Sequence, residues 1–332
     1  MAIVAATALL AVVVVVALAL GRFNVPLAHV VQILGSGLLP DGDVTESERT
    51  VVELVRLPRV LLAVLVGGGL GVAGAALQAT FRNPLVSPDI IGVSAGASLG
   101  GALALLLGLS SAFLVAGAFA FGLAALGLLF LLTWGRTAAP MLMVVLGGVV
   151  VGSFFSALVG LVTYFADPFT TLPAIVFWLL GSLATATFAK VAVAVIPILA
   201  GTAVLLLLRW RINVLSLGDE EATSLGLRPS RMRWVILISC ALVVAGAVAV
   251  SGVVGWVGLV IPHLARMWVG PDHRILLPVS FLLGAVYLIM IDTVARTATA
   301  GEVPLGVLTA LLGAPMFFIL LRRNRDRIWD SA

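Results

Sequence analysis

The sequence predicts an all-α membrane protein, a polytopic bundle of about ten transmembrane helices. Hydrophobic residues make up 62% of the 332 residues and charged residues only 10%, against roughly 45–50% and about 25% in soluble domains. Uncharged runs of about 20 residues recur, which is the length that crosses a hydrocarbon core of roughly 30 Å. The runs are apolar on every face, and this excludes a β-barrel, whose strands would alternate at every second residue.

The uncharged runs define the expected elements, and the whole chain, 1–332, is predicted to be a single transmembrane domain. We expect spans at residues 2–20, 60–80, 90–108, 112–133, 140–165, 189–208, 234–252, 255–269, 275–295 and 304–321. A shorter apolar stretch around Pro173, at 172–184, is too short to cross and should lie at the interface or re-enter the membrane. The first run lacks the basic start of a signal peptide, so it is interpreted as a retained span.

Small residues within the spans indicate how the helices pack. Gly67, Gly71 and Gly74 in one span, and Gly147 and Gly148 in another, would allow close helix–helix approach.

A short sequence pattern that occurs twice suggests an inverted repeat. Arg-x-x-Arg at 56–59 and again at 228–231 is followed by Val-Ala-Gly-Ala at the same distance, an offset of 172 residues. The first copy enters its span from one side of the membrane and the second from the other, as an inverted repeat requires. The same four letters also occur at 115–118, so chance coincidence is an alternative explanation.

The basic residues predict orientation. With ten spans both termini lie on the same side, and 13 of the 19 lysines and arginines fall there. The positive-inside rule therefore places both termini in the cytoplasm. The same rule explains the net charge of +4 better than nucleic-acid binding does. Cys240, the single cysteine, lies within an apolar run, so no internal disulfide is possible.

Several kinds of chemistry are missing from the sequence. The only lysine, Lys190, follows Ala-Thr-Phe-Ala rather than a phosphate-binding glycine loop, so the chain is not a conventional ATPase. Three scattered histidines without cysteine partners predict no metal site. Asp292 is the exceptional acid within a span, and a local helical ion pair with Arg296 explains it. Ion-coupled carriers usually need intramembrane ionisable residues, so the composition favours a permease driven by another chain.

Four segments differ from this apolar background. Arg56-Leu57-Pro58-Arg59 forms a basic patch at the outer mouth of the second span, serving either as interfacial anchors or as a partner site. The segment 78–97 is a proline-stiffened cytoplasmic turn. The loop 209–233 contains a short helix with an apolar stripe, which would dock into a groove on a soluble partner or rest on lipid headgroups. The fourth segment is 251–266 together with the tail segment 292–315.

These segments closely resemble the FecCD/BtuC-type permeases, the membrane subunits of type II ABC importers for iron–siderophore, haem and cobalamin. The matching pieces are RLPR, GAALQATFRNPLVSPDIIGVSAGA, LSLGDEEATSLGL, SGVVGWVGLVIPHLAR and GEVPLGVLTALLGAP. They occur in the family's order between residues 56 and 315.

The resemblance implies a second permease copy, forming a homodimer, two ATP-binding subunits on the cytoplasmic side, and a periplasmic substrate-binding protein outside. It implies that Arg56, Arg59 and Arg296 meet glutamates of the binding protein. It assigns coupling to the ATPases to Leu217, Gly218, Asp219, Glu220, Glu221, Ala222, Leu225 and Gly226, a helix at about 217–226. Spans five and ten would line the path, and the cytoplasmic turn and gate region would comprise Arg82, Asn83, Pro84, Thr137, Pro140 and Met141.

The expected function is therefore uptake of a metal chelate across the bacterial inner membrane, with iron(III)–siderophore as first choice. Haem and cobalamin stay open as cargo. An ion-coupled secondary transporter is the alternative from another class, and a membrane enzyme is the third. The chain itself is expected to be non-catalytic and to bind no cofactor or metal, with ATP and Mg²⁺ on the partner subunits, and no nucleic-acid partner is expected.

Overall fold

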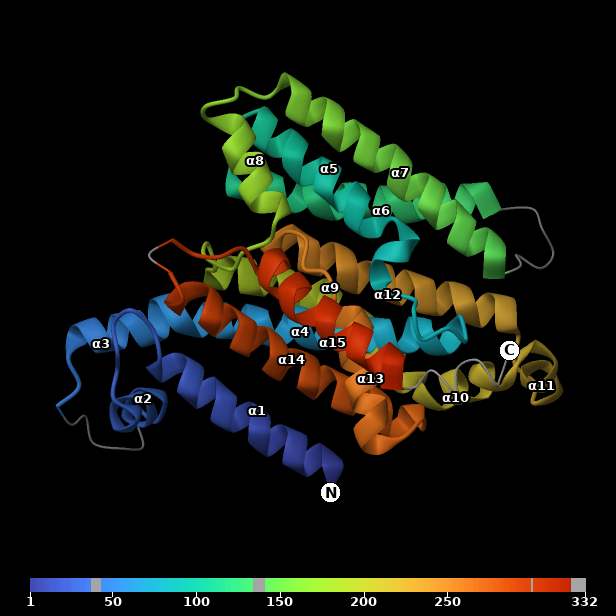
Figure 1. Cartoon of the computed structure of the whole chain (residues 1–332), viewed down its shortest axis with the longest axis horizontal. Helices are drawn as coiled ribbons and strands as arrows, with labels where there is room; N and C mark the ends of the chain where they lie inside the picture. Colours follow the sequence, from blue (N-terminus) through green and yellow to red (C-terminus); the bar gives the residue numbers. More distant parts are fainter. Residues whose placement is uncertain (37–42, 134–140, 300, 324–332) are drawn as a thin grey trace.

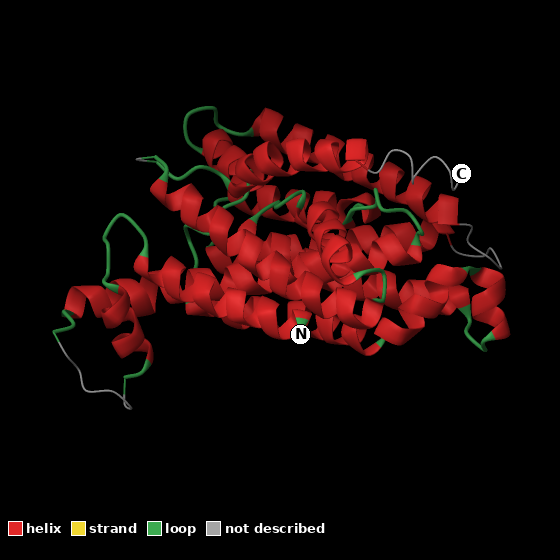
Figure 2. Ribbon diagram, turned by 60° about the horizontal axis from the view of Figure 1, so that its bottom comes forward, coloured by secondary structure: helices red, strands yellow, loops and turns green. Residues whose placement is uncertain are grey.

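The computed structural model describes residues 1–36, 43–133, 141–299 and 301–323, and the regular structure in these ranges is helical (Figures 1 and 2). The helices of ten or more residues are α1 (Ala2–Ala19), α4 (Leu57–Thr80), α5 (Val93–Leu106), α6 (Ser111–Thr133), α7 (Met141–Phe165), α9 (Phe188–Leu207), α12 (Pro229–Ser251), α13 (Val257–Val269), α14 (His273–Thr297) and α15 (Leu305–Arg323). The shorter elements are α2 (Leu27–Leu34), α3 (Glu46–Thr50), the π-helical turn η1 (Val51–Arg56), the 3-10 turn η2 (Pro88–Ile91), α8 (Thr171–Leu179), α10 (Arg209–Leu217) and α11 (Asp219–Ser224).

The ten predicted spans are confirmed as helices. Seven helices in the described ranges are long and apolar enough to cross a membrane, and α5, α13 and α15 are shorter apolar helices. The stretch predicted at 172–184 forms only the nine-residue α8. Its helix stops because Gly181 adopts a φ of 78°, a left-handed conformation that glycine accepts without steric cost.

The longest helical segment runs without interruption from α3 through η1 into α4. Its 35 residues, Glu46–Thr80, would extend about 53 Å at about 1.5 Å per residue, well beyond a hydrocarbon core of roughly 30 Å. One end of this segment therefore projects from the bundle. Figure 1 shows α2 and α3 at this end, which we call the α3 end, and α10 and α11 at the opposite end, which we call the α11 end.

Glycines allow α4 to pack at backbone distance against two neighbours. A Cβ atom added to Gly67 would lie 2.3 Å from the carbonyl oxygen of Gly284 on α14, and one added to Gly284 would lie 2.2 Å from that of Gly67. A Cβ on Gly74 would lie 1.9 Å from the carbonyl oxygen of Gly258 on α13. These contacts confirm the predicted packing role of the α4 glycines. Without a hydrophobic force between helices in lipid, such close packing is what holds a bundle together.

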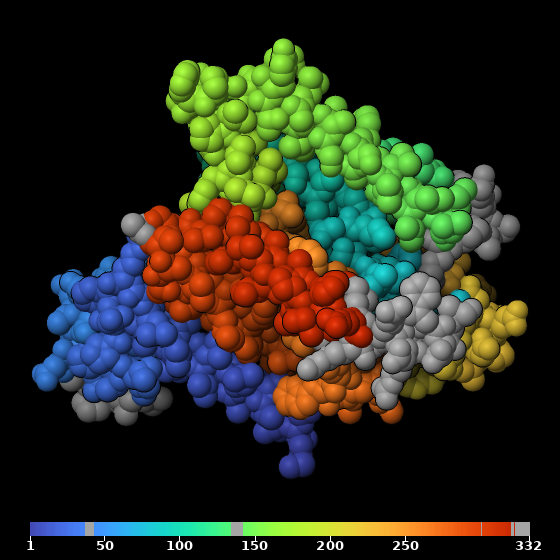
Figure 3. Space-filling view, viewed as in Figure 1, coloured from blue at the N-terminus to red at the C-terminus, as the bar shows by residue number. Residues whose placement is uncertain are grey.

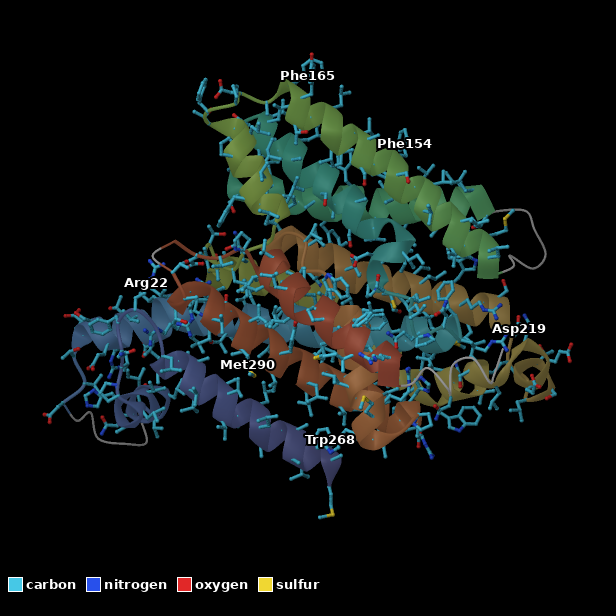
Figure 4. The ribbon with its side chains drawn as sticks, in the orientation of Figure 1. Arg22, Phe154, Phe165, Asp219, Trp268 and Met290 are labelled. Carbon is cyan, nitrogen blue, oxygen red and sulfur yellow. The ribbon has the colours of Figure 1, made fainter. Side chains whose placement is uncertain are left out.

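Helices α5 to α8 form a group on one flank of the bundle, whereas α1 lies on the opposite flank against α14 (Figure 1). Within this group Gly148 of α7 approaches the carbonyl oxygen of Ile90, to which an added Cβ would come within 2.0 Å, so the predicted packing role of this glycine is also confirmed. The flank leaves much of α7 uncovered. Figure 4 labels Phe154 and Phe165, which point away from the chain.

The chain breaks its helical path between α12 and α13, where Gly252 and Trp256 both have a φ of 67°. For tryptophan this left-handed backbone is unusual and strained. Backbone hydrogen bonds join the start of the break to the segment after α8, and that segment to the start of α15. Ser182 N donates to Ser251 O at 2.8 Å, and Gly306 N donates to Leu180 O at 2.9 Å. The segment after α8, the end of α12 and the start of α15 thus meet at one junction.

Candidate functional site

Two acids and an arginine form an ion-pair network toward the α3 end. Arg59 of α4 donates from Nε to both carboxylate oxygens of Asp292 on α14, each at 2.8 Å. Its two terminal nitrogens donate to the two oxygens of Glu302, again at 2.8 Å. Hydrogen bonding from Arg59 holds the pKa of Glu302 below its ordinary value. Paired fork geometry of this kind is the strongest form of a guanidinium–carboxylate contact.

Two further arginines bind the end of α1. Arg56 donates to Leu18 O at 2.6 Å and to Ala19 O at 2.8 Å, and Arg296 donates to Ala17 O. These carbonyls belong to the last turn of α1, where the helix itself offers no further amide. The amide of Val25 in the following loop also donates to Ala19 O, at 3.1 Å. The cationic groups satisfy them and complement the negative end of the helix dipole. We call Arg56, Arg59, Asp292, Arg296 and Glu302 the arginine cluster.

The structure thus brings together the three arginines that the family resemblance assigned to binding-protein docking. Their exposed fractions are only 4% for Arg56, 6% for Arg59 and 8% for Arg296, and their partners here lie within the chain. Docking through them stays a prediction. The predicted local ion pair of Asp292 with Arg296 is present at 3.8 Å, but Arg59 on another helix is the closer partner at 2.8 Å, and the sequence did not reveal it. The tight α4–α14 contact places the two helices near enough for this pairing.

At the α11 end, α10 and α11 form an arm (residues 209–226) that lies outside the row of long helices (Figure 1). The predicted short helix is confirmed, since α11 begins directly after Gly218, with a φ of 142°, and ends before Gly226, with a φ of 80°. Leu217 and Leu225 are 60% and 56% exposed, and they flank the helix. Ala222 faces inward and is fully buried, so the predicted apolar stripe is reduced to the two leucines.

Charge on the arm follows the helix dipole. Asp219, Glu220 and Glu221 occupy the first turn of α11, where negative charge is stabilised. Asp219 is paired with Arg233 of α12, which fixes the arm to the next long helix. Glu220 and Glu221 are exposed. Figure 4 places Asp219 at the outermost edge of the α11 end.

The turn after α4 lies against this arm. Arg82 adopts a φ of 47° as the chain leaves the helix, and Asn83 N donates to Gln78 O at 3.1 Å to close the turn. An added Cβ on Gly218 would lie 3.5 Å from a terminal nitrogen of Arg82. Of the other residues predicted for the turn and gate, Pro84 lies in the same turn and Met141 starts α7. Thr137 and Pro140 lie outside the described residues.

A third surface is apolar and lies between α7 and α15, the helices expected to line the path. Figure 3 shows this face of the molecule hollowed between α7 and the α14–α15 pair, with α5 visible at its floor. The exposed large side chains on the two helices include Leu146, Val150, Leu161, Tyr164, Leu311 and Phe318. In the part of the chain that the structure describes, no three His, Cys, Asp or Glu residues are grouped so as to hold a metal ion.

Sequence reasoning missed Glu302 as the second partner of Arg59. The residue stands in the quoted segment GEVPLGVLTALLGAP, but hydropathy places it in a loop and does not indicate which helix it faces. The one indication in the sequence was that Glu302 is an acid placed directly before the final predicted span.

In the described part of the chain, a bundle of apolar helices, three of them short for a full crossing, thus carries an arm at one end and the arginine cluster at the other. The FecCD transport family matches residues 9–323, and the chain belongs to this family. It is the permease of an ABC importer, a class in which the ATPase activity lies on other subunits.

The similar proteins differ in what their names say they carry. The chain is 42% identical over 315 residues to the molybdate import system permease MolB of Haemophilus influenzae, covering 95% of this chain and 93% of that protein. It is 44% identical over 272 residues to a probable iron chelatin transport permease of Helicobacter pylori, covering 82% of each. A solved inward-facing structure of a metal-chelate type ABC transporter superposes with a TM-score of 0.87 at 41% identity, over 97% of this chain and 98% of that one.

Proposed function

We propose that the chain imports an intact metal chelate, with iron(III)–siderophore as first choice, across the bacterial inner membrane, with both termini in the cytoplasm. In this proposal two copies pair across the α7–α15 surface, and two ATP-binding subunits dock on the arm. A substrate-binding protein approaches the α3 end. The chain contributes no catalytic residue, and ATP with Mg²⁺ is bound by the ATPase subunits.

The observation that carries this proposal is the arm itself. Two exposed leucines, Leu217 and Leu225, flank a helix that presents the acids Glu220 and Glu221. An isolated pair of leucines beside exposed carboxylates suits a groove with an apolar floor and basic rim on a soluble partner. A helix lying in lipid headgroups would favour basic residues on its polar face, and α11 itself has none. The charge pattern therefore favours a protein partner over the membrane surface.

The double variant Leu217→Asp/Leu225→Asp tests this docking. Two buried carboxylates would disrupt an apolar interface, so we expect ATP-dependent uptake to fall at least about tenfold. The measurement is co-purification of the ATPase subunits with the permease, together with uptake into proteoliposomes. The matched control is Leu107→Asp/Leu109→Asp, an exposed leucine pair on the loop between α5 and α6, which should leave ATPase binding unchanged. Normal co-purification of the arm variant would reject the arm as the docking surface.

Support for a chelate as cargo comes from the relatives' names and from the apolar surface. The names include iron chelatin, hemin and cobalamin as well as molybdate. A bulky complex that keeps its metal enclosed needs no ligating side chains from its carrier, and the exposed side chains of α7 and α15 are largely apolar. A wide, weakly interacting path suits such a complex because tight binding would slow its release.

Uptake assays identify the cargo. The permease, reconstituted with its ATPase subunits and substrate-binding protein, is supplied with labelled ferric siderophore, hemin, cobalamin or molybdate. We expect ATP-dependent accumulation of the ferric siderophore to exceed that of the other three by at least about tenfold, a modest discrimination for a binding-protein-dependent importer. Preferential uptake of molybdate would replace the chelate proposal with an oxyanion importer. Uptake that persists without ATP and collapses with an ionophore would instead indicate an ion-coupled carrier.

A further inference from the structure

Asn213 of α10 makes the short hydrogen bonds that fasten the arm to the start of α14. The backbone amide of His273 donates to Asn213 Oδ1 at 2.8 Å, and the ring Nδ1 of His273 lies 2.6 Å from the same oxygen. Asn213 Nδ2 donates to Asp272 Oδ1 at 2.6 Å. Because an amide N–H must donate and a carboxylate oxygen must accept, these contacts together fix which end of the Asn213 side chain carries the oxygen.

These contacts make Asn213 part of the α14 cap, although it belongs to another helix. Asp272 is the N-cap residue of α14 and accepts from the amide of Arg274 at 2.9 Å. Hydrogen bonds from the Arg274 amide and then from Asn213 lower the pKa of Asp272, so its carboxylate stays ionised. The first amide of α14, that of His273, is satisfied by Asn213 rather than by a residue of its own segment. Any shift of α10 along its axis therefore pulls on this cap.

The two helices joined at this point lead in opposite directions. Only Gly218 separates α10 from α11, the helix at the outer edge of the arm. From the cap, the 25 residues of α14 extend toward the α3 end, where Asp292 binds Arg59. Other contacts between α10 and α14 are less specific. Arg209 reaches the carbonyl oxygen of Arg274 at 3.4 Å, and Ile212 and Leu215 are buried in the apolar core. Asn213 therefore makes the contact between α10 and α14 that depends most on the relative position of the two helices.

We propose that Asn213 is the positioning residue through which movement of the arm reaches α14, so that the Asn213–Asp272–His273 contact couples ATP hydrolysis to the opening of the permease. This inference rests on the proposed docking of ATPases on the arm. Apolar packing lets one helix slide over another at little cost. Three short hydrogen bonds to the start of a helix, in contrast, can all form in only one relative position of the two helices. The contact therefore transmits a displacement that the neighbouring leucine and isoleucine contacts would absorb.

An exchange of the two side chains tests the proposal. Asn213→Asp removes the donor to Asp272 and sets two carboxylates against each other at the present distance of 2.6 Å. Asp272→Asn alone keeps the cap, since asparagine caps helices as well as aspartate does. In the double variant Asn213→Asp/Asp272→Asn, the new carboxylate accepts from both nitrogens of His273 and from the new amide, so the link between α10 and the start of α14 is restored with the charge moved to α10. The cap bond from the Arg274 amide is given up, because in the native protein it ends on the same Asp272 oxygen that faces Asn213.

The readout is cargo moved per ATP hydrolysed, measured in proteoliposomes containing the complete transporter. We expect Asn213→Asp and Asn213→Leu to hydrolyse ATP at near-normal rates while moving at least about fivefold less cargo per ATP, within the range of a single coupling contact. The double variant restores the link but not the Arg274 cap bond, so it should recover part of the wild-type ratio and exceed Asn213→Asp alone. A merely structural role would lower ATPase binding, hydrolysis and transport in proportion, and the exchange would not selectively restore the ratio.

Three results would overturn the inference. They are a normal ratio in Asn213→Leu, an equal loss of hydrolysis and transport in Asn213→Asp, or a double variant as impaired as Asn213→Asp. If Asn213→Leu does not assemble, the comparison of Asn213→Asp with the double variant decides alone. The Leu217→Asp/Leu225→Asp variant separates this inference from the proposed docking. Normal transport by that variant would reject the arm as the ATPase site, whereas its failure beside a normal Asn213→Leu would reject only the role of Asn213.

Discussion

Replacing Gly74 with alanine is expected to destabilise the bundle by at least about 3 kcal/mol, the upper range for overpacking a closely packed interior. The new Cβ would lie 1.9 Å from the carbonyl oxygen of Gly258, and a backbone atom cannot rotate away as a side chain can. Helices α4 and α13 must therefore separate. The measurement uses Cys240, the only cysteine, which is fully buried and so reacts with a thiol-specific dye only when the chain unfolds. The midpoint temperature of labelling in detergent reports the loss.

The matched control is Gly127→Ala in α6. Gly127 is also a helical glycine, but no heavy atom lies within 4 Å of the position that its Cβ would take. Alanine favours a helix over glycine by roughly 1 kcal/mol, so this variant should be unchanged or slightly more stable. An equal fall in labelling temperature for both variants would show that helix-interior glycines act through propensity or flexibility, and would contradict the role given to close α4–α13 contact.

The spans could be predicted from hydropathy because length and the absence of charge are sufficient to identify a helix in lipid. The ends of α11 could also be predicted, since Gly218 and Gly226 take positive φ values that stop a helix on either side. The spacing of Gly67, Gly71 and Gly74 within one span was enough to predict that these glycines lie at a helix–helix contact. Their partners, Gly284 and Gly258, were not, because a one-dimensional pattern does not say which helices become neighbours.

The polar contacts of the arginine cluster were likewise only partly predictable, because the sequence does not show which helices are neighbours. Local spacing suggested that Asp292 pairs with Arg296, one turn away on α14. That ion pair is present, and the structure adds a closer one to Arg59, 233 positions earlier in the chain, because α4 and α14 approach so closely along their glycines. The Asn213–His273 contact between α10 and α14 was unpredictable for the same reason. Only its Asp272 half, an N-cap pattern directly before a span, is readable from sequence.

Replacing Asp292 with alanine is expected to be the second large effect, a loss of about 3–5 kcal/mol, as found when one member of a buried ion pair is removed. The carboxylate is only 4% exposed and faces guanidinium groups on two helices. Its removal leaves Arg59 with Glu302 alone and leaves Arg296 with the end of α1. The cost arises because charge stays buried without its main counter-ion. Labelling of Cys240 on heating measures this loss on the same scale as for Gly74→Ala.

Glu302→Gln is the control for Asp292→Ala, because both variants change a carboxylate that is bound to Arg59. Glu302 is also bound to Arg59, but its side chain is 25% exposed and lies in the loop before α15. Water can replace part of its interaction, and the glutamine still accepts one hydrogen bond, so a loss of only about 1 kcal/mol is expected. Equal losses in the two variants would mean that the Arg59 pairings act through the loop rather than through the α4–α14 contact. A greater loss at Asp292 would instead mean that the arginine cluster stabilises the two helices against each other, and that a partner engaging Arg59 from outside must compete with Asp292 for it.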